Sequence, residues 1–285
     1  MKIMTQLLER TALFCVKILP LRTLYKLIKV LPPSIMARLL SSFELLKVYR
    51  VSLFGKEFSI ESGPRDDHYL DLEKDGLRTW EHEALSIWAR EVRKAEIAVD
   101  VGAYLGIYSI LAAKLGCPRV LALEPNSSNF VQLQKNLLLN NLGDSVVSHR
   151  VAVGAESKTV SMITPGGRPN SSGSQISDSP TGRELGSWEI ESVVDMVTLD
   201  ALLVGETARI SVIKIDAEGY ELFILQGAIR TLSSHSPSIL IELLNEQKKS
   251  EADDFLRHFG YFQGNPIETS DVCTNFLYQH SCSSG

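Results

Sequence analysis

Long apolar runs and paired cysteines are both missing from this sequence. No window holds the 18 or more uninterrupted apolar residues that a membrane-spanning helix requires, so we predict no such helix. The four cysteines are scattered without a Cys-x-x-Cys pair, and the six histidines show no metal-ligand spacing. These absences argue against a zinc site and against a disulfide framework. They favour a reducing compartment, so we expect a cytoplasmic protein.

Length and composition narrow the class of protein. The chain has 285 residues, of which 44% are hydrophobic and 22% are charged. These fractions are typical of a soluble globular protein, and they exclude a mainly disordered chain, a collagen and a multi-span membrane protein. A single hydrophobic core rarely grows past about 250–300 residues. We therefore expect one large domain, or one domain with an appendage.

Charge is distributed unevenly along the chain. Residues 1–56 hold ten lysines and arginines against two acids, whereas the remaining residues hold 19 basic and 32 acidic groups. A broad phosphate-binding face needs clustered lysine and arginine, which the acidic body lacks. We therefore predict that nucleic acid is not a partner.

The basic residues 1–50 are predicted to form a helical N-terminal extension. Pro20 and Pro32-Pro33 divide it into three short helices, and an apolar stripe recurs every three or four residues. Two interpretations stay open. In the first interpretation, the basic groups contact an anionic membrane surface, which would make the protein peripheral to the membrane. Alternatively, the stripe packs on the domain itself or on a second subunit of a homo-oligomer.

Residues 51–96 are predicted to lead from this extension into the core. Val51–Phe54 and Glu57–Glu61, joined around Gly55, have the pattern of a β-hairpin. Thr79–Arg93 has the apolar spacing of a helix.

Residues 97–285 are predicted to form an α/β domain. Short buried runs alternate there with helical segments, which indicates a mainly parallel sheet with helices on both faces. Helices are expected at 127–141, 220–232 and 251–259, and the tail adds an edge hairpin of 261–263 and 275–280. The runs that predict the other strands are Ile97–Val101, Val120–Leu123, Val146–Val153, Ile210–Ile215 and Ile239–Leu243.

One segment of this domain breaks the alternation. Residues 165–191 are rich in glycine, serine, proline and asparagine and show almost no periodicity. A loop this long inside a compact domain is either a functional lid or disordered. Hydroxyl and amide donors suit a polyol, so we place substrate contacts at Asn170, Ser172 and Ser174, with a solvated loop as the alternative.

A glycine-containing turn follows the first predicted strand of this domain. Asp100 could accept a hydrogen bond from a cationic amine, Gly102 allows a sharp turn, and Gly106 permits a ligand against the helix. A larger side chain at 102 is expected to block the ligand and leave the fold largely intact. Glu124 ends the next strand, where an acid can bind the two hydroxyls of a ribose. The G-x-x-x-G spacing and the acid at Asp100 favour S-adenosylmethionine over NAD.

Charged residues alternate at the end of the fourth predicted strand. Lys214 and Asp216 share one face of it, and Glu218 follows. We expect Asp216 to face the cofactor's methyl group and to accept the proton of an acceptor hydroxyl, with Lys214 beside it and Glu218 toward the substrate. Glu242, at the end of the fifth strand, is a second candidate base. The alternatives are a structural ion pair for Lys214 and Asp216, and a solvated acid for Glu242.

Four segments resemble the FkbM-type family of S-adenosylmethionine-dependent methyltransferases. They are VDVGAYLGIYS at 99–109, LALEPNSSNFVQL at 121–133 with Asn136 and Asn140, VTLD at 197–200 with IKIDAEG at 213–219, and PSILIEL at 237–243. The resemblance covers about residues 97–245. Tyr104 stands where the family more usually has asparagine.

The resemblance implies a class I methyltransferase fold (Rossmann-like), in which a seven-stranded sheet has an antiparallel last strand. It also implies a family acid at Glu81, although His82 replaces the usual proline that follows it. The cofactor contacts that it implies are Asp100, Gly102, Tyr104, Gly106, Glu124, Asn126 and the region of Val151-Ala152.

These observations predict a methyltransferase that uses S-adenosyl-L-methionine. Enzymes that methylate amino groups of flat nucleobases typically carry an Asn/Asp-Pro-Pro-aromatic element where this chain has Asp216-Ala217-Glu218-Gly219. The family resemblance points instead to O-methylation of a small-molecule or glycan acceptor, namely a hydroxyl on a sugar, a glycolipid or a secondary metabolite. We predict no resident metal, with a divalent ion at Asp216 as the alternative. The competing interpretation is a non-catalytic scaffold or regulator that binds S-adenosylmethionine. An NAD-dependent enzyme is the weakest of the three interpretations.

Overall fold

The computed structural model describes residues 47–63, 66, 69–165, 173–176, 188–269 and 273–281. Residues 1–46, which hold most of the predicted helical extension, lie outside these ranges, as do Asn170 and Ser172 of the predicted lid. Among the described residues, no helix is long and apolar enough to cross a membrane.

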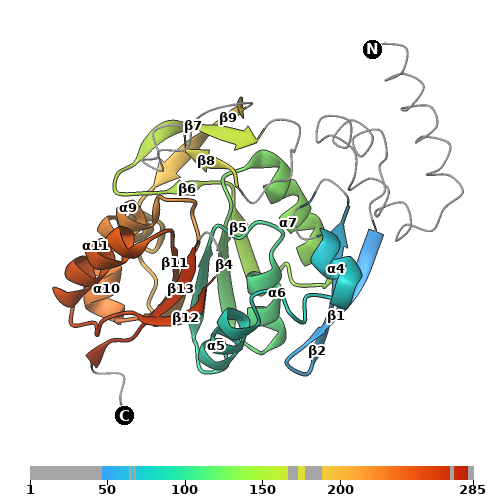
Figure 1. The fold of residues 1–285 in the computed structure, drawn as a ribbon, viewed down its shortest axis with the longest axis horizontal. Helices are drawn as coiled ribbons and strands as arrows, with labels where there is room; N and C mark the ends of the chain where they lie inside the picture. Colours follow the sequence, from blue (N-terminus) through green and yellow to red (C-terminus); the bar gives the residue numbers. More distant parts are fainter. Residues whose placement is uncertain are drawn as a thin grey trace, which may run out of the picture.

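A seven-stranded sheet forms the centre of the molecule (Figure 1). Its order is β12-β13-β11-β10-β3-β4-β5, and among these strands β13 runs in the direction opposite to the other six. This topology confirms the predicted class I methyltransferase fold. The strands are β3 (Ile97–Val101), β4 (Arg119–Leu123), β5 (Val146–His149), β10 (Ile210–Ile215), β11 (Ser238–Leu243), β12 (Asn265–Thr269) and β13 (Thr274–Tyr278).

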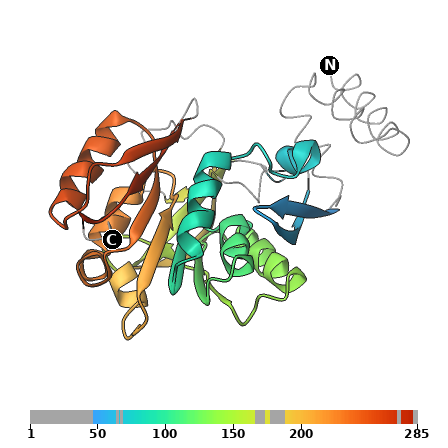
Figure 2. The same ribbon diagram turned by 90° about the horizontal axis from the view of Figure 1, so that it is seen from below.

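Helices cover both faces of this sheet, as Figure 2 shows. α5 (His82–Val92), α6 (Ile107–Lys114) and α7 (Ser127–Leu139) lie on one face. α8 (Leu199–Leu202), α9 (Glu221–Gln226), α10 (Ile229–His235) and α11 (Glu246–Arg257) lie on the other. Each face has its own hydrophobic core, so that Ala98 of β3 packs on one side and its neighbours Ile97 and Val99 pack on the other. Burial on both faces explains why the central strands β3, β4, β10 and β11 are mainly apolar.

The predicted hairpin is present and packs on the helices. β1 (Lys47–Leu53) and β2 (Lys56–Ser62) pair antiparallel, with α4 (Tyr69–Asp75) following in sequence. Asn136 of α7 and Asn140, the residue just after α7, hold the backbone of β2. Asn140 Oδ1 accepts from the Ser59 amide and Asn136 Oδ1 from the Glu61 amide, each at 2.8 Å. The paired asparagines of the second family segment therefore attach the hairpin to the core.

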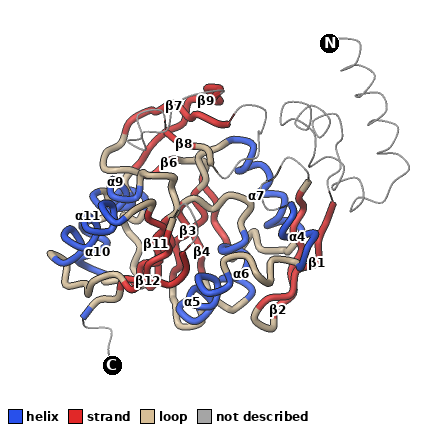
Figure 3. The backbone as a smooth tube through the Cα atoms, in the orientation of Figure 1, coloured by secondary structure: helices blue, strands red, loops and turns tan. Residues whose placement is uncertain are grey.

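A second, four-stranded sheet was not predicted. Its order is β6-β9-β7-β8, and it appears above the central sheet in Figure 3. Its strands are β6 (Ala152–Val153), β7 (Lys158–Pro165), β8 (Gln175–Ile176) and β9 (Trp188–Val197). We call it the small sheet.

The small sheet corrects two predictions. The single strand predicted at 146–153 is two, because the chain leaves β4 after His149 and pairs with β9 from Ala152. The predicted lid at 165–191 contains β8 and the start of β9. β7 and β9 alternate buried with more exposed residues (Val160 and Met162 are buried), and a search for continuous apolar runs passes over that pattern.

Three further element boundaries differ from the predictions. Residues 220–232 form two helices with a break at Gly227 and Ala228, and a Cβ at Gly227 would collide with the Gly154 carbonyl. The first tail strand lies at 265–269, and Tyr261 makes only an isolated bridge to His280. α11 begins at Glu246, five residues earlier than predicted, behind an Asn245 cap.

Candidate active site

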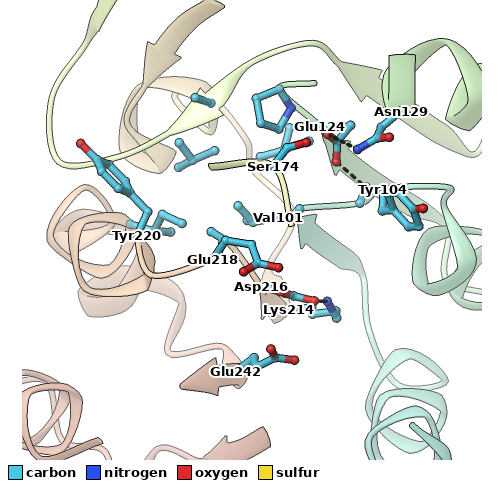
Figure 4. Close-up of a pocket in the computed structure, with 18 of the residues that line it drawn as sticks. Val101, Tyr104, Glu124, Asn129, Ser174, Lys214, Asp216, Glu218, Tyr220 and Glu242 are labelled. Carbon is cyan, nitrogen blue, oxygen red and sulfur yellow. Dashed lines mark hydrogen bonds and ion pairs between the residues drawn. The ribbon is translucent and has the colours of Figure 1, made fainter. Parts of the chain in front are cut away.

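A pocket opens at the carboxyl ends of β3, β4, β10 and β11, beneath the small sheet. The strand order reverses beside β3, which is where open α/β sheets leave a crevice for ligands. The pocket holds about 1070 Å³ when the space at its mouth is included. Figure 4 shows Glu124, Asn129 and Ser174 at one end, and Lys214, Asp216 and Glu242 at the other.

The structure brings most of the predicted site residues to this pocket and leaves three off its lining. Those off the lining are Asp100, Gly106 and Asn126. The predicted cofactor residues that line it are Glu81, Gly102, Tyr104, Glu124, Ala152 and Asp216. The predicted catalytic and substrate residues that line it are Lys214, Asp216, Glu242, Ser174 and Glu218.

Glu124 is buried at the end of β4 with its carboxylate held by amides. Oε2 accepts from the Tyr104 amide at 2.8 Å, and Oε1 accepts from the Asn126 amide at 2.9 Å and from Asn129 Nδ2 at 3.3 Å. Burial raises the pKa of Glu124 to about 7, and these hydrogen bonds oppose the rise. A carboxylate has about four lone-pair sites, so one remains for further donors. Asn129 is a site residue that sequence reasoning missed.

Tyr104 connects the pocket with the segment after the hairpin. Its backbone is left-handed, with φ of 48°, a conformation that is several-fold enriched in asparagine and uncommon for a bulky residue. Its hydroxyl donates to Asp66 Oδ1 at 2.8 Å, and Asp66 also accepts from Ser62 at 2.8 Å.

Asp100 lies behind the pocket and not in it. Its Oδ2 accepts from Ser109 at 2.6 Å, and its Oδ1 is buried without a hydrogen-bond partner among the described residues. Burial raises the pKa of Asp100, and the charge of Lys214 opposes the rise. We predicted that this carboxylate contacts an amine of the ligand directly. In the structure it instead accepts a hydrogen bond from Ser109 of α6.

The two glycines of the turn serve packing within the protein. The Asp216 amide donates to the Val101 carbonyl at 3.1 Å, which draws the Asp216 backbone over Gly102. A Cβ at Gly102 would collide with the Asp216 carbonyl oxygen, and one at Gly106 would meet the Leu133 side chain of α7. The expectation that these glycines make room for a ligand is therefore wrong, because neighbouring protein atoms fill both spaces.

We expect Gly102→Ala to destabilise the fold by about 2–4 kcal/mol, since overpacking adds to the cost of a left-handed backbone. Gly205→Ala is the matched control. Gly205 has φ of +85°, close to the +81° of Gly102, but nothing lies within 4 Å of its added Cβ. Urea unfolding should therefore show a loss of only about 1 kcal/mol for the control. Equal losses in the two variants would contradict the collision.

Lys214 carries a charge that its surroundings hold in place. Its Nζ lies 2.9 Å from Asp216 Oδ2 and 4.5 Å from the centroid of the Tyr108 ring, and it pairs in register with Asp100 of β3. Burial lowers the pKa of Lys214, but the carboxylates of Asp216, Asp100 and Glu81 raise it further and leave it above its ordinary value. A permanently protonated amine cannot accept a proton. Lys214 is therefore a counter-ion for Asp216 and not a base.

Two more carboxylates complete this end of the pocket. Glu81 precedes α5 with a left-handed φ of 40° and accepts from the Tyr108 hydroxyl at 2.7 Å. Burial raises the pKa of Glu81 to about 7. The charge of Asp216 and burial raise the pKa of Glu242 to about 8. At pH 7 Glu242 therefore mostly retains its proton, whereas Glu81 is protonated in only about half of the molecules. Sequence reasoning also missed Tyr108, although it lies two residues after Gly106 in the first family segment.

The loop after Asp216 is held by Glu221, which sequence reasoning did not single out. Glu221 Oε1 accepts from the amides of Ala217 (3.2 Å) and Gly219 (2.8 Å). Between these two, Glu218 is left-handed with φ of 51° and lines the pocket. Oε2 of Glu221 is buried without a hydrogen-bond partner among the described residues, and burial raises the pKa of Glu221 to about 7. The sequence did offer a signal for Glu221, because an acidic residue in the first turn of a predicted helix commonly accepts hydrogen bonds from backbone amides there.

We expect this raised pKa to make the ligand-free protein less stable as pH rises. The carboxyl group has a pKa of 4.5 as a free side chain and about 7 in the fold, so its favourable contribution is complete below 4.5 and is lost as pH rises through about 7. Relative to Glu221→Gln, the wild type should lose about 2 kcal/mol between about pH 5.5 and about pH 7.5. Urea unfolding of both proteins at each pH measures this. Parallel pH profiles would contradict it.

Metal ligands do not gather in the described part of the chain. No three histidine, cysteine, aspartate or glutamate side chains there are placed to hold one ion.

Comparison with known proteins identifies the family. The family described as Methyltransferase FkbM domain matches residues 100–262, which is more than half of the chain. Among solved structures, the methyltransferase FkbM from Methylobacillus flagellatus KT is 21% identical with a TM-score of 0.44. The match covers 64% of this chain and 43% of that chain, so this chain spans less than half of that structure's length. No curated protein sequence matches the chain.

Two other structures are similar over more of their own length. Precorrin-6y C5,15-methyltransferase from Geobacter metallireducens GS-15 is 14% identical, with a TM-score of 0.43 and coverage of 69% of this chain and 87% of that one. Ribosomal protein L11 methylase from Lactobacillus delbrueckii subsp. bulgaricus is 14% identical, with a TM-score of 0.42 and coverage of 69% and 76%. Methyltransferase families of this kind generally use S-adenosylmethionine. With more than half of its length matched by the family's domain, the chain belongs to the FkbM family of methyltransferases.

Proposed function

We propose that this protein binds S-adenosylmethionine and methylates a hydroxyl group of a neutral small molecule or glycan. The observation that carries the proposal is the two-ended pocket, with a buried amide-held carboxylate at Glu124 and a lysine-paired carboxylate at Asp216. When bound, S-adenosylmethionine supplies an already activated methyl group on a sulfonium.

The residues at the Glu124 end fit the nucleoside part of this cofactor. The carboxylate of Glu124 keeps acceptor capacity after its three hydrogen bonds, and a ribose diol offers two donors. Apolar side chains of Leu123, Met162 and Ile176 line the pocket and suit a flat aromatic base. A diphosphate is a poor fit, because the described lining includes five carboxylates and a single lysine.

The residues at the other end suit a hydroxyl acceptor. Asp216 is partly exposed to the pocket, with 29% of its side chain accessible, and Lys214 orients it through the 2.9 Å ion pair. In our proposal Asp216 accepts the proton of the acceptor hydroxyl as that oxygen reacts. Glu242 mostly holds its proton at pH 7, so it can donate a hydrogen bond to another oxygen of the same acceptor. Anionic acceptors would be repelled by Asp216.

The test combines binding with transfer. Calorimetry with S-adenosylmethionine and with NAD should show saturable binding of the first only. A radiolabelled methyl group should then pass to neutral glycans or glycolipids in a panel that also contains phosphorylated sugars and amines. Binding without transfer to any panel member would favour a non-catalytic scaffold, and transfer only to amines would overturn the hydroxyl assignment.

A further inference from the structure

We propose that Asn126 is a positioning residue, which ties the small sheet to the Glu124 end of the pocket and does not itself contact the cofactor. The consequence for binding rests on the proposed function, but the tie itself does not. Asn126 is fully buried, so its side-chain polar atoms must find partners within the protein.

All the side-chain hydrogen-bonding groups of Asn126 are used. Its Oδ1 accepts from the amides of Ser128 (2.9 Å) and Asn129 (3.0 Å), which caps α7. Its Nδ2 donates to Ser174 Oγ at 3.0 Å and to Thr164 Oγ1 at 3.3 Å. An amide nitrogen has two hydrogens, so no donor is left for a ligand. The predicted cofactor contact at Asn126 is therefore replaced by contacts to β7 and to the residue before β8.

The two hydroxyls close this arrangement. Thr164 Oγ1 and Ser174 Oγ lie 3.2 Å apart, so the three side chains are mutually hydrogen-bonded. We call Asn126, Thr164 and Ser174 the latch. It joins the start of α7 to the small sheet at a point where Ser174 lines the pocket (Figure 4).

β8 is the edge strand of its sheet, with β7 as its neighbour. It is two residues long and pairs with β7 only at Gln175 and Ile176. Both residues line the pocket with Ser174, opposite the cofactor residues of β3 and β4. The small sheet also meets the core through its β6–β9 end, where Gly154 packs against Gly227, and through Met162 and Ile176, which pack in one apolar cluster with Tyr220. The latch is therefore a polar tie that holds the β8 end of the sheet beside Glu124.

The latch also reaches Glu124 directly. The amide of Asn126 donates to Glu124 Oε1, so one residue holds both the carboxylate and the small sheet. Without the latch, residues 174–176 would have to be ordered when ligand binds, and that ordering weakens affinity. The reacting end at Asp216 would be unchanged.

Two kinds of substitution separate the latch from the helix cap. Ser174→Ala and Thr164→Val remove the acceptors and leave the cap of α7 intact. Asn126→Ser keeps a good capping residue and removes the reach to β7 and β8. Asn245→Ser is the matched control, because Asn245 caps α11 through Lys248 without any such tie.

Each latch variant should weaken S-adenosylmethionine binding about 5- to 10-fold and raise its KM without lowering kcat. The double variant Asn126→Ser with Ser174→Ala should be no weaker than the worse single variant, because both break the same bond. Asn245→Ser should change neither constant. Unchanged affinity in all three latch variants, or losses that add in the double variant, would overturn the proposal.

Hydrogen exchange of the ligand-free protein tests the tie without any cofactor. Amides of Gln175 and Ile176 should exchange about tenfold faster in Ser174→Ala and Asn126→Ser than in the wild type or Asn245→Ser. If wild type fails to bind S-adenosylmethionine but these rates rise, the proposed function falls and the latch stands. Equal exchange rates in all four proteins would refute the latch itself.

Discussion

Turnover should fall about 10²–10⁴-fold in Asp216→Asn, while the affinity for S-adenosylmethionine stays within about threefold of wild type. The amide keeps the shape of the side chain and can still contact Lys214, but it cannot accept the proton of an acceptor hydroxyl. Single-turnover transfer of a labelled methyl group, with calorimetry on the same preparations, separates the two quantities.

The control for Asp216→Asn must break a buried ion pair that lies elsewhere. Asp253→Asn does so, because Asp253 Oδ2 lies 2.6 Å from Lys249 Nζ and neither residue lines the pocket. It should lower stability and leave turnover unchanged. If Asp216→Asn retains near wild-type turnover, Glu242→Gln and an added chelator distinguish a second carboxylate base from a metal ion, and Asp216 is not the base.

Affinity for S-adenosylmethionine should fall more than 100-fold in Glu124→Ala. Removal of the carboxylate deletes the charge-assisted hydrogen bond that its remaining acceptor site makes to a ribose, worth about 1.5–3 kcal/mol. It also frees the amides of Tyr104 and Asn126, which now hold the pocket wall. Glu124→Gln keeps the shape and should cost about 10- to 100-fold.

The pH dependence of binding gives this prediction a second readout. Burial raises the pKa of Glu124 to about 7, so the carboxyl group is protonated below that pH and has fewer lone pairs to offer. Wild-type affinity should therefore strengthen as pH rises through 7, and Glu124→Gln should flatten this rise. Calorimetric titration at several pH values measures both. Unchanged affinity in Glu124→Ala would remove Glu124 from the ribose site.

Several features of the fold followed from local sequence pattern. The five mainly apolar runs predicted a parallel sheet covered on both faces, because most residues buried on both sides of a strand are apolar. The acids at 124, 216 and 242 each directly follow or end such a run. Since parallel strands end at one edge, their convergence on one pocket was predictable. Strands β7 and β9 were not predicted, because they do not form such continuous apolar runs.

Roles that depend on distant neighbours were decided only by the tertiary structure. Gly102 is required by the carbonyl of Asp216, which is 114 positions later in the printed sequence. Asn126 is committed to Thr164 and Ser174, and the amine of Lys214 is kept charged by carboxylates from three other positions. A local pattern encodes which residues are buried and which backbone conformations are easy. It does not encode which side chains contact one another, because packing between elements determines the distances between them. These contacts decide whether a polar side chain is available to bind a ligand or is already used within the protein.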